Sequence, residues 1–115
     1  MAQSQVQVNV TLPTGLHDQV KQAVLERGAR AGRPITVREF YSDAVRSLTR
    51  RIDAGEDIIF AAHPPGGVKQ LAIRLEPDAG ALVQRFRTVT TLSSFISTAV
   101  RHYLQEDNEC RTTRP

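Results

Sequence analysis

The sequence has few of the residues from which redox, metal and membrane-spanning sites are built. It contains one cysteine, Cys110, no tryptophan and three histidines. A lone cysteine forms no internal disulfide, and the scattered histidines have none of the spacings of a metal site. No run of about 18 apolar residues would cross a membrane as a helix. Because no basic segment followed by an apolar core opens the chain, we expect a cytoplasmic protein. The cysteine and histidine content leads us to expect neither a cofactor nor a metal.

The composition is that of one small globular domain with a slight basic surplus. The chain has 115 residues, of which 40% are hydrophobic and 23% charged, values that are typical of ordinary soluble proteins. Fifteen Lys and Arg against twelve Asp and Glu give a net charge of +3. The whole surplus falls within residues 1–53, which is suggestive of an anionic partner. We expect a single domain over residues 1–115.

The first half of the chain is predicted to form one strand followed by two helices. Residues 5–12 alternate polar and apolar side chains, which predicts a half-buried strand that ends at Pro13. Thr14 is then expected to cap a helix over about 15–31, closed by a glycine at position 32. Thr36, followed three residues later by a glutamate, forms a capping box and predicts a second helix over about 37–53.

The second half repeats this order. Residues 70–75 alternate again, Pro77 again stands beside the strand end, and helices are expected over about 78–88 and 91–105. The strand ends align at an offset of 63 residues, and the final helices align at an offset of 55. The helix matches are Thr36/Thr91, Phe40/Phe95, Tyr41/Ile96, Ala44/Ala99, Val45/Val100, Arg46/Arg101 and Leu48/Tyr103. The chain is therefore interpreted as a duplication, with repeat 1 over 5–53, a linker over 54–68, repeat 2 over 69–105 and a polar tail over 106–115.

The linker carries an apolar stretch, Ile58–Ala62, between glycine- and proline-containing segments. At roughly 3.3 Å per extended residue the linker spans up to about 50 Å, so the two strands can meet. The apolar stretch is either a third, edge strand or a segment laid over the core, and we favour the second.

A lone strand leaves its backbone groups unpaired, whereas two copies can pair with each other. We therefore expect an α+β, mostly helical fold: a two-stranded antiparallel ribbon with four helices packed beneath it. The alternation assigns seven side chains to the inner face: Val6, Val8, Val10, Leu12, Leu71, Ile73 and Leu75. It assigns seven others to the outer face: Gln5, Gln7, Asn9, Thr11, Gln70, Ala72 and Arg74. In an alternative architecture each strand pairs with a strand of another chain, but the non-identical repeats favour pairing within one chain.

Two stretches in each half, Val6–Pro13 with Thr36–Leu48 and Gln70–Pro77 with Thr91–Tyr103, resemble the ribbon-helix-helix family of DNA-binding proteins, which includes the Arc and MetJ repressors. A chain with both copies resembles the TraY-type conjugation accessory proteins. The resemblance implies a pseudo-dimer whose ribbon enters the major groove of DNA. By position it assigns base reading to Gln7, Asn9, Thr11, Gln70, Ala72 and Arg74, and phosphate binding to Thr36, Val37, Arg38, Thr91, Leu92 and Ser93.

The chemistry of these residues agrees with that assignment. Glutamine and asparagine pair bidentately with adenine, and arginine pairs with guanine. Arg33 and Arg38 are expected to add positive charge beside the helix starts, where free N–H groups suit a phosphate. Ala72 offers only apolar contact, for example to a thymine methyl group, so the two halves are expected to read different half-sites.

The expected function is sequence-specific binding of double-stranded DNA in a bacterial cytoplasm. It serves either transcriptional repression or plasmid transfer and partition, and further copies of the chain along DNA or a relaxosome or partition protein are the expected protein partners. The alternative is a protein-interaction module, antitoxin-like or an assembly adaptor, with Ile58–Ala62 as its contact surface. The short tail from Gln105 argues against an antitoxin. An enzyme is not expected, because the carboxylates are isolated and no nucleophile stands near a base; His17 is expected on a helix surface.

Overall fold

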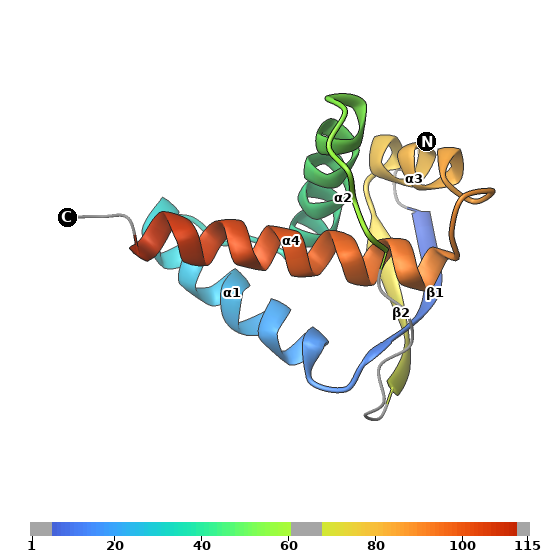
Figure 1. Cartoon of the computed structure of the whole chain (residues 1–115). Coiled ribbons are helices and arrows are strands. Elements are labelled where there is room, and N and C mark those ends of the chain that lie inside the picture. The colour runs from blue at the N-terminus through green and yellow to red at the C-terminus, as the bar shows by residue number, and fades with distance from the viewer. Residues whose placement is uncertain (1–5, 61–67, 113–115) are drawn as a thin grey trace.

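The structure is a computed structural model that describes the backbone of residues 6–60 and 68–112 and the side chains of 7–60 and 68–106. Its elements follow the predicted order (Figure 1). They are β1 (Val6–Pro13), α1 (Leu16–Ala31), α2 (Val37–Asp53), β2 (Val68–Leu75), α3 (Pro77–Arg85) and α4 (Leu92–Thr112). The predicted α+β class is confirmed: four helices pack with a two-stranded antiparallel sheet.

The two strands form a ribbon with one apolar and one polar face. β1 and β2 are antiparallel, and their register places Asn9 opposite Ala72. Val10, Leu12, Ile73 and Leu75 are buried, and Val8 and Leu71 are partly buried against the core. The predicted inner face is therefore confirmed for these six residues, whereas Gln5 and the side chain of Val6 lie outside the described part of the chain.

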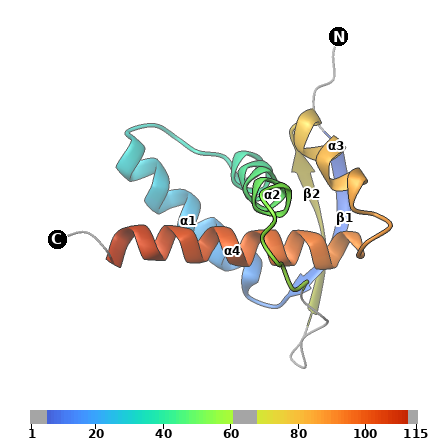
Figure 2. The same ribbon diagram turned by 45° about the horizontal axis from the view of Figure 1, so that its top comes forward.

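The helices connect the two halves of the chain through one core. α2 packs against β2 and α3, while α4 packs against β1. α2 and α4 also pack against each other, and Figure 2, which looks along α2, shows α4 running crosswise to it. Each of these helices thus covers the strand of the other half. The shared core includes Tyr41, Phe40, Phe95, Leu48, Ile96 and Val100.

The predicted helix caps are confirmed at two of three places. Thr36 caps α2 by accepting a hydrogen bond from the Glu39 amide at 3.0 Å, and Thr91 accepts one from the Ser94 amide at 3.1 Å. The expectation that Thr14 caps α1 was wrong. Gly15 occupies that N-cap with φ of 93°, a left-handed conformation that glycine adopts without steric cost and threonine does not.

The predicted end of the last helix was also wrong. α4 continues through residues 106–112, which were expected to belong to the polar tail. Apolar periodicity stops near Leu104, but residues 105–112 include no proline or glycine, and the glutamine and glutamates among them are good helix formers. In the first half of the chain the predicted bounds of α2 are confirmed.

The linker segment Ile58–Phe60 lies over the core rather than in the sheet. The sheet has two strands among the described residues, and the Phe60 ring centroid lies 6.1 Å from that of Phe95. Ile58 and Phe60 are half-buried, whereas Ile59 is 87% exposed. The favoured of the two predicted alternatives is confirmed for these residues; Ala61 and Ala62 lie outside the described part.

Arg46 ties α2 to the start of α3. Its guanidinium bonds Asp43 at 2.7 Å, Asp78 at 2.7 and 2.8 Å, and Glu76. The hydrogen bonds that Arg46 donates to Asp78 and Glu76 raise the pKa of Arg46 above its usual value, and those to Asp78 lower the pKa of that carboxyl. One cation therefore holds three carboxylates that would otherwise repel one another.

Replacing Arg46 with alanine is expected to lower the free energy of unfolding by about 1–2 kcal/mol. Each charge-assisted bond contributes modestly near solvent, and the loss also leaves three carboxylates unpaired. Urea denaturation measures the change. Arg50→Ala, one turn away and exposed, is the control and is expected to change the free energy by less than about 0.5 kcal/mol. Equal effects of the two substitutions would contradict the role given to Arg46.

His17 is not the simple helix-surface residue that the sequence suggested. Its Nδ1 lies 2.7 Å from the hydroxyl of Tyr41, which is fully buried, and the two rings stack with centroids 5.9 Å apart. Burial, and then the nearby Lys21, lower the pKa of His17. Burial also raises the pKa of Tyr41 above its usual value.

Stability is consequently expected to fall as the pH drops below about 6.5. The unfolded chain has a His17 pKa of about 6.5, and the folded chain has a lower one, so between them the unfolded state binds more protons. Thermal unfolding between about pH 5 and 7.5 measures this loss. The substitution His17→Gln keeps a polar partner for Tyr41 and is expected to flatten the profile in this window. An unchanged profile would show that other groups cause the pH dependence.

Candidate nucleic-acid interface

The outer face of the ribbon gathers all six predicted base-reading residues. The antiparallel register joins them in three directly opposed pairs: Gln7 with Arg74, Asn9 with Ala72, and Thr11 with Gln70. Thr11 is half-buried and the other five are exposed. These six residues, called the reader face below, form two parallel rows because alternate side chains of a strand point to the same side.

The dimensions of the reader face suit a nucleic-acid groove. Residues two apart in a strand are about 6.8 Å apart along it, which is about two base-pair steps of about 3.4 Å. Each row of three therefore spans about four base-pair steps. The major groove is about 12 Å wide and admits a two-stranded ribbon with its side chains against the base edges.

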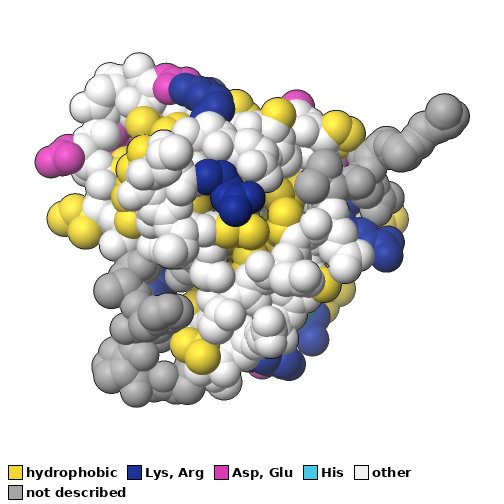
Figure 3. All heavy atoms as spheres, turned by 90° about the vertical axis from the view of Figure 1, so that its right-hand side faces the viewer, with side chains coloured by type: hydrophobic (Ala, Val, Ile, Leu, Met, Phe, Trp, Pro, Cys, Tyr) yellow, Lys and Arg dark blue, Asp and Glu magenta, His cyan; other side chains and the backbone are white. Residues whose placement is uncertain are grey.

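The charge on this side of the molecule is favourable to an anion. Arg74 is the one charged member of the reader face and forms no ion pair with any described residue. Figure 3 views the side of the molecule on which the ribbon lies. Uncharged atoms predominate there, a Lys or Arg side chain stands near the centre, and the visible Asp and Glu side chains lie toward the margin. A phosphate backbone would meet little repulsion across the middle of this surface.

The start of α4 is attached directly to the ribbon. The Thr11 amide donates a hydrogen bond to Ser93 Oγ at 2.8 Å, and the Thr91 hydroxyl is used by the Ser94 amide. Leu92 packs against the core. Of the three predicted phosphate-binding residues here, two thus have their hydroxyls engaged by backbone N–H groups. What the first turn still offers is the backbone N–H groups of Leu92 and Ser93, which lie before the first intrahelical bonds.

The start of α2 has the same free backbone groups and an arginine. The Thr36 hydroxyl and carbonyl accept from the amides of Glu39 and Phe40, so the N–H groups of Val37 and Arg38 precede the helical ladder. Arg38 Nε is the one buried side-chain nitrogen or oxygen without a hydrogen-bond partner among the described residues. Its guanidinium makes no ion pair in that part of the chain. The charge of Arg38 helps to lower the pKa of the neighbouring Glu39 carboxyl, but Arg38 holds no carboxylate in an ion pair within the described residues.

Arg33 occupies a different environment from the one the sequence suggested. Its guanidinium bonds Glu39 at 3.1 Å, which lowers the pKa of that carboxyl. It also bonds the Pro34 carbonyl. An arginine already paired with a carboxylate has less charge to offer a phosphate, so of the two arginines predicted for the clamp, Arg38 is the better placed.

A polar hollow that the sequence did not predict lies just before α4. It has a volume of about 430 Å³ and is lined by Arg87, Thr88, Val89, Thr90, Thr91 and Leu92. Its hydroxyls and Arg87 adjoin the same helix start that Ser93 attaches to β1. The signal that would have found it is a basic residue and two threonines within the short turn before the predicted helix cap Thr91.

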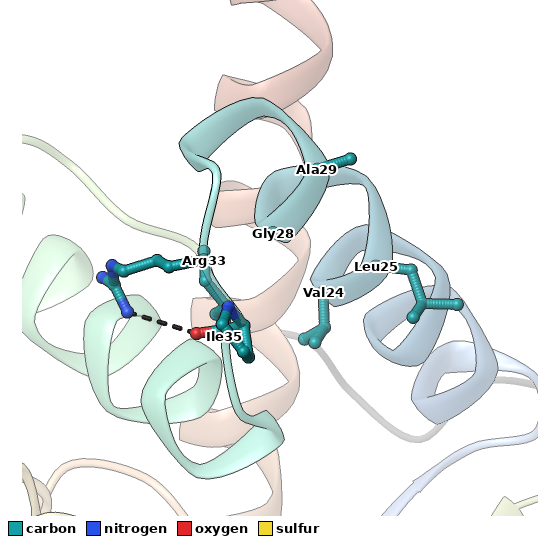
Figure 4. A pocket seen from close by; sticks show the side chains of 7 residues that line it. Val24, Leu25, Gly28, Ala29, Arg33 and Ile35 are labelled. Atoms are coloured by element: carbon teal, nitrogen blue, oxygen red, sulfur yellow. Dashed lines mark hydrogen bonds between the residues drawn. The ribbon is translucent and has the colours of Figure 1, made fainter.

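A second hollow, apolar and about 270 Å³ in volume, lies between α1 and the segment that leads into α2 (Figure 4). Val24, Leu25, Gly28, Ala29, Arg33, Pro34 and Ile35 line it. Leu25 is 70% exposed at its edge. A Cβ added at Gly28 would lie 3.1 Å from the Arg33 carbonyl oxygen, so glycine permits the close approach of this segment to α1.

Neither a metal cluster nor a membrane helix occurs in the described part of the chain. No group of three or more His, Cys, Asp or Glu residues there is arranged to hold a metal ion. No helix there is both long and apolar enough to cross a membrane. The chain matches no protein-family model, no curated protein and no solved structure.

Proposed function

We propose that this protein binds double-stranded DNA sequence-specifically by inserting the ribbon of β1 and β2 into the major groove. The observation that carries the proposal is the reader face: six alternate side chains, five of them exposed, in three opposed pairs on one side of a ribbon. Gln7, Asn9 and Gln70 have the amide groups that pair with adenine, and Arg74 has the guanidinium that pairs with guanine.

We further propose that the chain is a ribbon-helix-helix pseudo-dimer, with both copies in one polypeptide. The register supports this, because Asn9 lies opposite Ala72 and these positions are also counterparts at the 63-residue offset. In a two-fold pair of strands the central residue faces its own counterpart. The exchange of helices, α2 onto β2 and α4 onto β1, has the same two-fold character.

The helix starts complete the proposed interface. Free N–H groups and positive dipole ends attract anions such as phosphate, and α2 and α4 each begin with two such groups. In this role Thr36, Val37, Arg38, Thr91, Leu92 and Ser93 hold the phosphate backbone on either side of the ribbon, while the reader face contacts the bases. Phosphate contacts fix position and base contacts supply specificity.

The biological setting proposed for this activity is repression of transcription or accessory binding in plasmid transfer or partition, in the cytoplasm and without cofactor or catalysis. Further copies along DNA, or a relaxosome or partition protein, are the proposed protein partners. The alternative, a protein-interaction module, rested on Ile58–Ala62. Because Ile58 and Phe60 are half-buried against the protein's own core, Ile59 is what remains of that surface within the described residues.

Selection from a random double-stranded library at about 150 mM salt, followed by sequencing, tests the proposal. The wild-type chain is expected to enrich a short motif of about five base pairs. The matched control is a triple variant, Gln7→Ala, Asn9→Ala and Arg74→Ala, which changes exposed side chains and leaves the core intact. It is expected to retain DNA through phosphate contacts but to lose the base preference at the guanine and at the centre of the motif, while any preference under Thr11 and Gln70, which it keeps, remains. A wild-type chain that retains no DNA, or retains it without a motif, contradicts the proposed function.

A further inference from the structure

The two ends of the reader face differ in chemistry. At one end Gln7 lies opposite Arg74, so the pair carries a positive charge and five guanidinium donors on one side. At the other end Thr11 lies opposite Gln70, and this pair is neutral. At the centre Asn9 has an amide, whereas Ala72 opposite it has only a methyl group. The backbones of the two strands are therefore related by a two-fold axis, but the side chains at equivalent positions differ.

The starts of α2 and α4, which flank the ribbon, also differ in charge. At the 55-residue offset of the final helices, Arg38 is the counterpart of Ser93. Arg38 is a cation that forms no ion pair with a described residue, while the neutral Ser93 hydroxyl accepts a hydrogen bond from the Thr11 amide. α2, which carries Arg38, packs against β2, the strand of Arg74. α4, which carries Ser93, packs against β1.

We propose that the protein binds a non-palindromic DNA site in a single orientation, with a guanine under the Gln7–Arg74 pair and an A·T-rich end under the Thr11–Gln70 pair. This inference rests on the proposed function and adds the form of the target to it. The Asn9–Ala72 pair reads a central A·T pair, because asparagine pairs with adenine and an alanine methyl group contacts that of thymine.

The spacing of residues along β2 determines at which base pair of the DNA site the guanine is required. Arg74 stands two residues from Ala72, which is about 6.8 Å along the strand and about two base-pair steps. The required guanine is therefore about two steps from the centre, on one side only. Moving it to the mirror position is expected to lower affinity about 5- to 150-fold, the range for one bidentate contact.

Two symmetrised variants test the inference. Thr11→Arg with Ala72→Asn gives both strands the outward series Gln, Asn, Arg, and is expected to select a palindrome with a guanine on each side. Arg74→Thr with Ala72→Asn gives both strands Gln, Asn, Thr, and is expected to select an A·T-rich palindrome. The single variant Ala72→Asn keeps the unequal ends and is the control, because its motif is expected to remain asymmetric.

The outcomes separate this inference from the function beneath it. An asymmetric wild-type motif that becomes palindromic in a symmetrised variant supports the inference. A palindromic wild-type motif, or symmetrised variants whose motifs stay asymmetric, overturns it while leaving DNA binding intact. Absence of any wild-type motif overturns the proposed function as well. Thermal unfolding identifies any variant that does not fold. If the variant with Thr11→Arg is unstable, the variant with Arg74→Thr decides the question, because Arg74 is an exposed strand residue.

Discussion

Substitution of Phe95 by alanine is expected to lower the free energy of unfolding by about 3–5 kcal/mol. Phe95 is 1% exposed, and its ring centroid lies 5.0 Å from that of Phe86 and 6.1 Å from that of Phe60. It joins α4, the turn after α3 and the segment that crosses from α2 to β2. Since small domains are stable by about 5–15 kcal/mol in total, this variant is expected to be largely unfolded near 50 °C, and urea denaturation measures the loss.

The control for Phe95 is Ile59→Ala. Ile59 belongs to the same crossing segment but is 87% exposed, so its truncation is expected to change stability by less than about 0.5 kcal/mol. If Ile59→Ala instead cost as much as Phe95→Ala, the segment would not lie on the core through Phe60 as the structure has it.

The second large effect concerns binding. Arg74→Ala is expected to reduce affinity for the selected DNA site by about 1–3 kcal/mol, because one bidentate contact to guanine disappears. Since Arg74 is exposed and makes no ion pair with a described residue, folding is expected to be unaffected. Titration of the variant against sites that differ at one base pair measures the discrimination, which is expected to vanish at the guanine and to persist elsewhere.

Arg38→Ala provides the contrast. As a phosphate contact, Arg38 is expected to contribute equally to all sequences, so its removal weakens binding uniformly and lowers the slope of log affinity against log salt by about 1. Discrimination at the guanine is expected to remain. Identical behaviour of the Arg38 and Arg74 variants, in both specificity and salt slope, would be incompatible with the separate roles assigned to them.

Much of the fold was predictable because local pattern and tertiary packing agree. Strict alternation over residues 5–12 and 70–75 identifies both strands and the face each of them buries, since a one-residue change of register would move every valine to solvent. Thr36 and Thr91 identify two helix starts because a hydroxyl at the N-cap satisfies an amide that the helix leaves free. Placing the two strands opposite each other also followed, since neither can pair alone.

Other features depended on contacts that no local pattern encodes. The hydrogen bond of His17 joins residues 24 positions apart, and that between Thr11 and Ser93 joins residues 82 positions apart. The pairing of Arg33 with Glu39 arises because the chain turns between α1 and α2, and a capping-box pattern alone assigns that glutamate to the helix start. The length of α4 was underestimated because the sequence of residues 105–112 has no apolar periodicity from which a helix would be predicted.

The reader face illustrates both cases. Its six members were predicted from alternation and from the family resemblance, but which of them oppose one another is a property of the register. Because of that pairing, one end of the reader face is charged, the other end is neutral, and the two central side chains differ. Arg87, Thr88 and Thr90 were not predicted, unlike the adjacent Thr91, because a turn of mixed residues has no periodicity and only its position beside the start of α4 draws attention to it.

Amide chemical shifts in a ¹⁵N-labelled sample, recorded with and without a duplex that carries the selected site, show which residues meet the DNA. Insertion of the ribbon into the major groove predicts the largest changes at Gln7, Asn9, Thr11, Gln70, Ala72 and Arg74, with a second group in the first turns of α2 and α4. Changes confined to the apolar hollow around Leu25 and Ile35, with the strand amides unmoved, would contradict it.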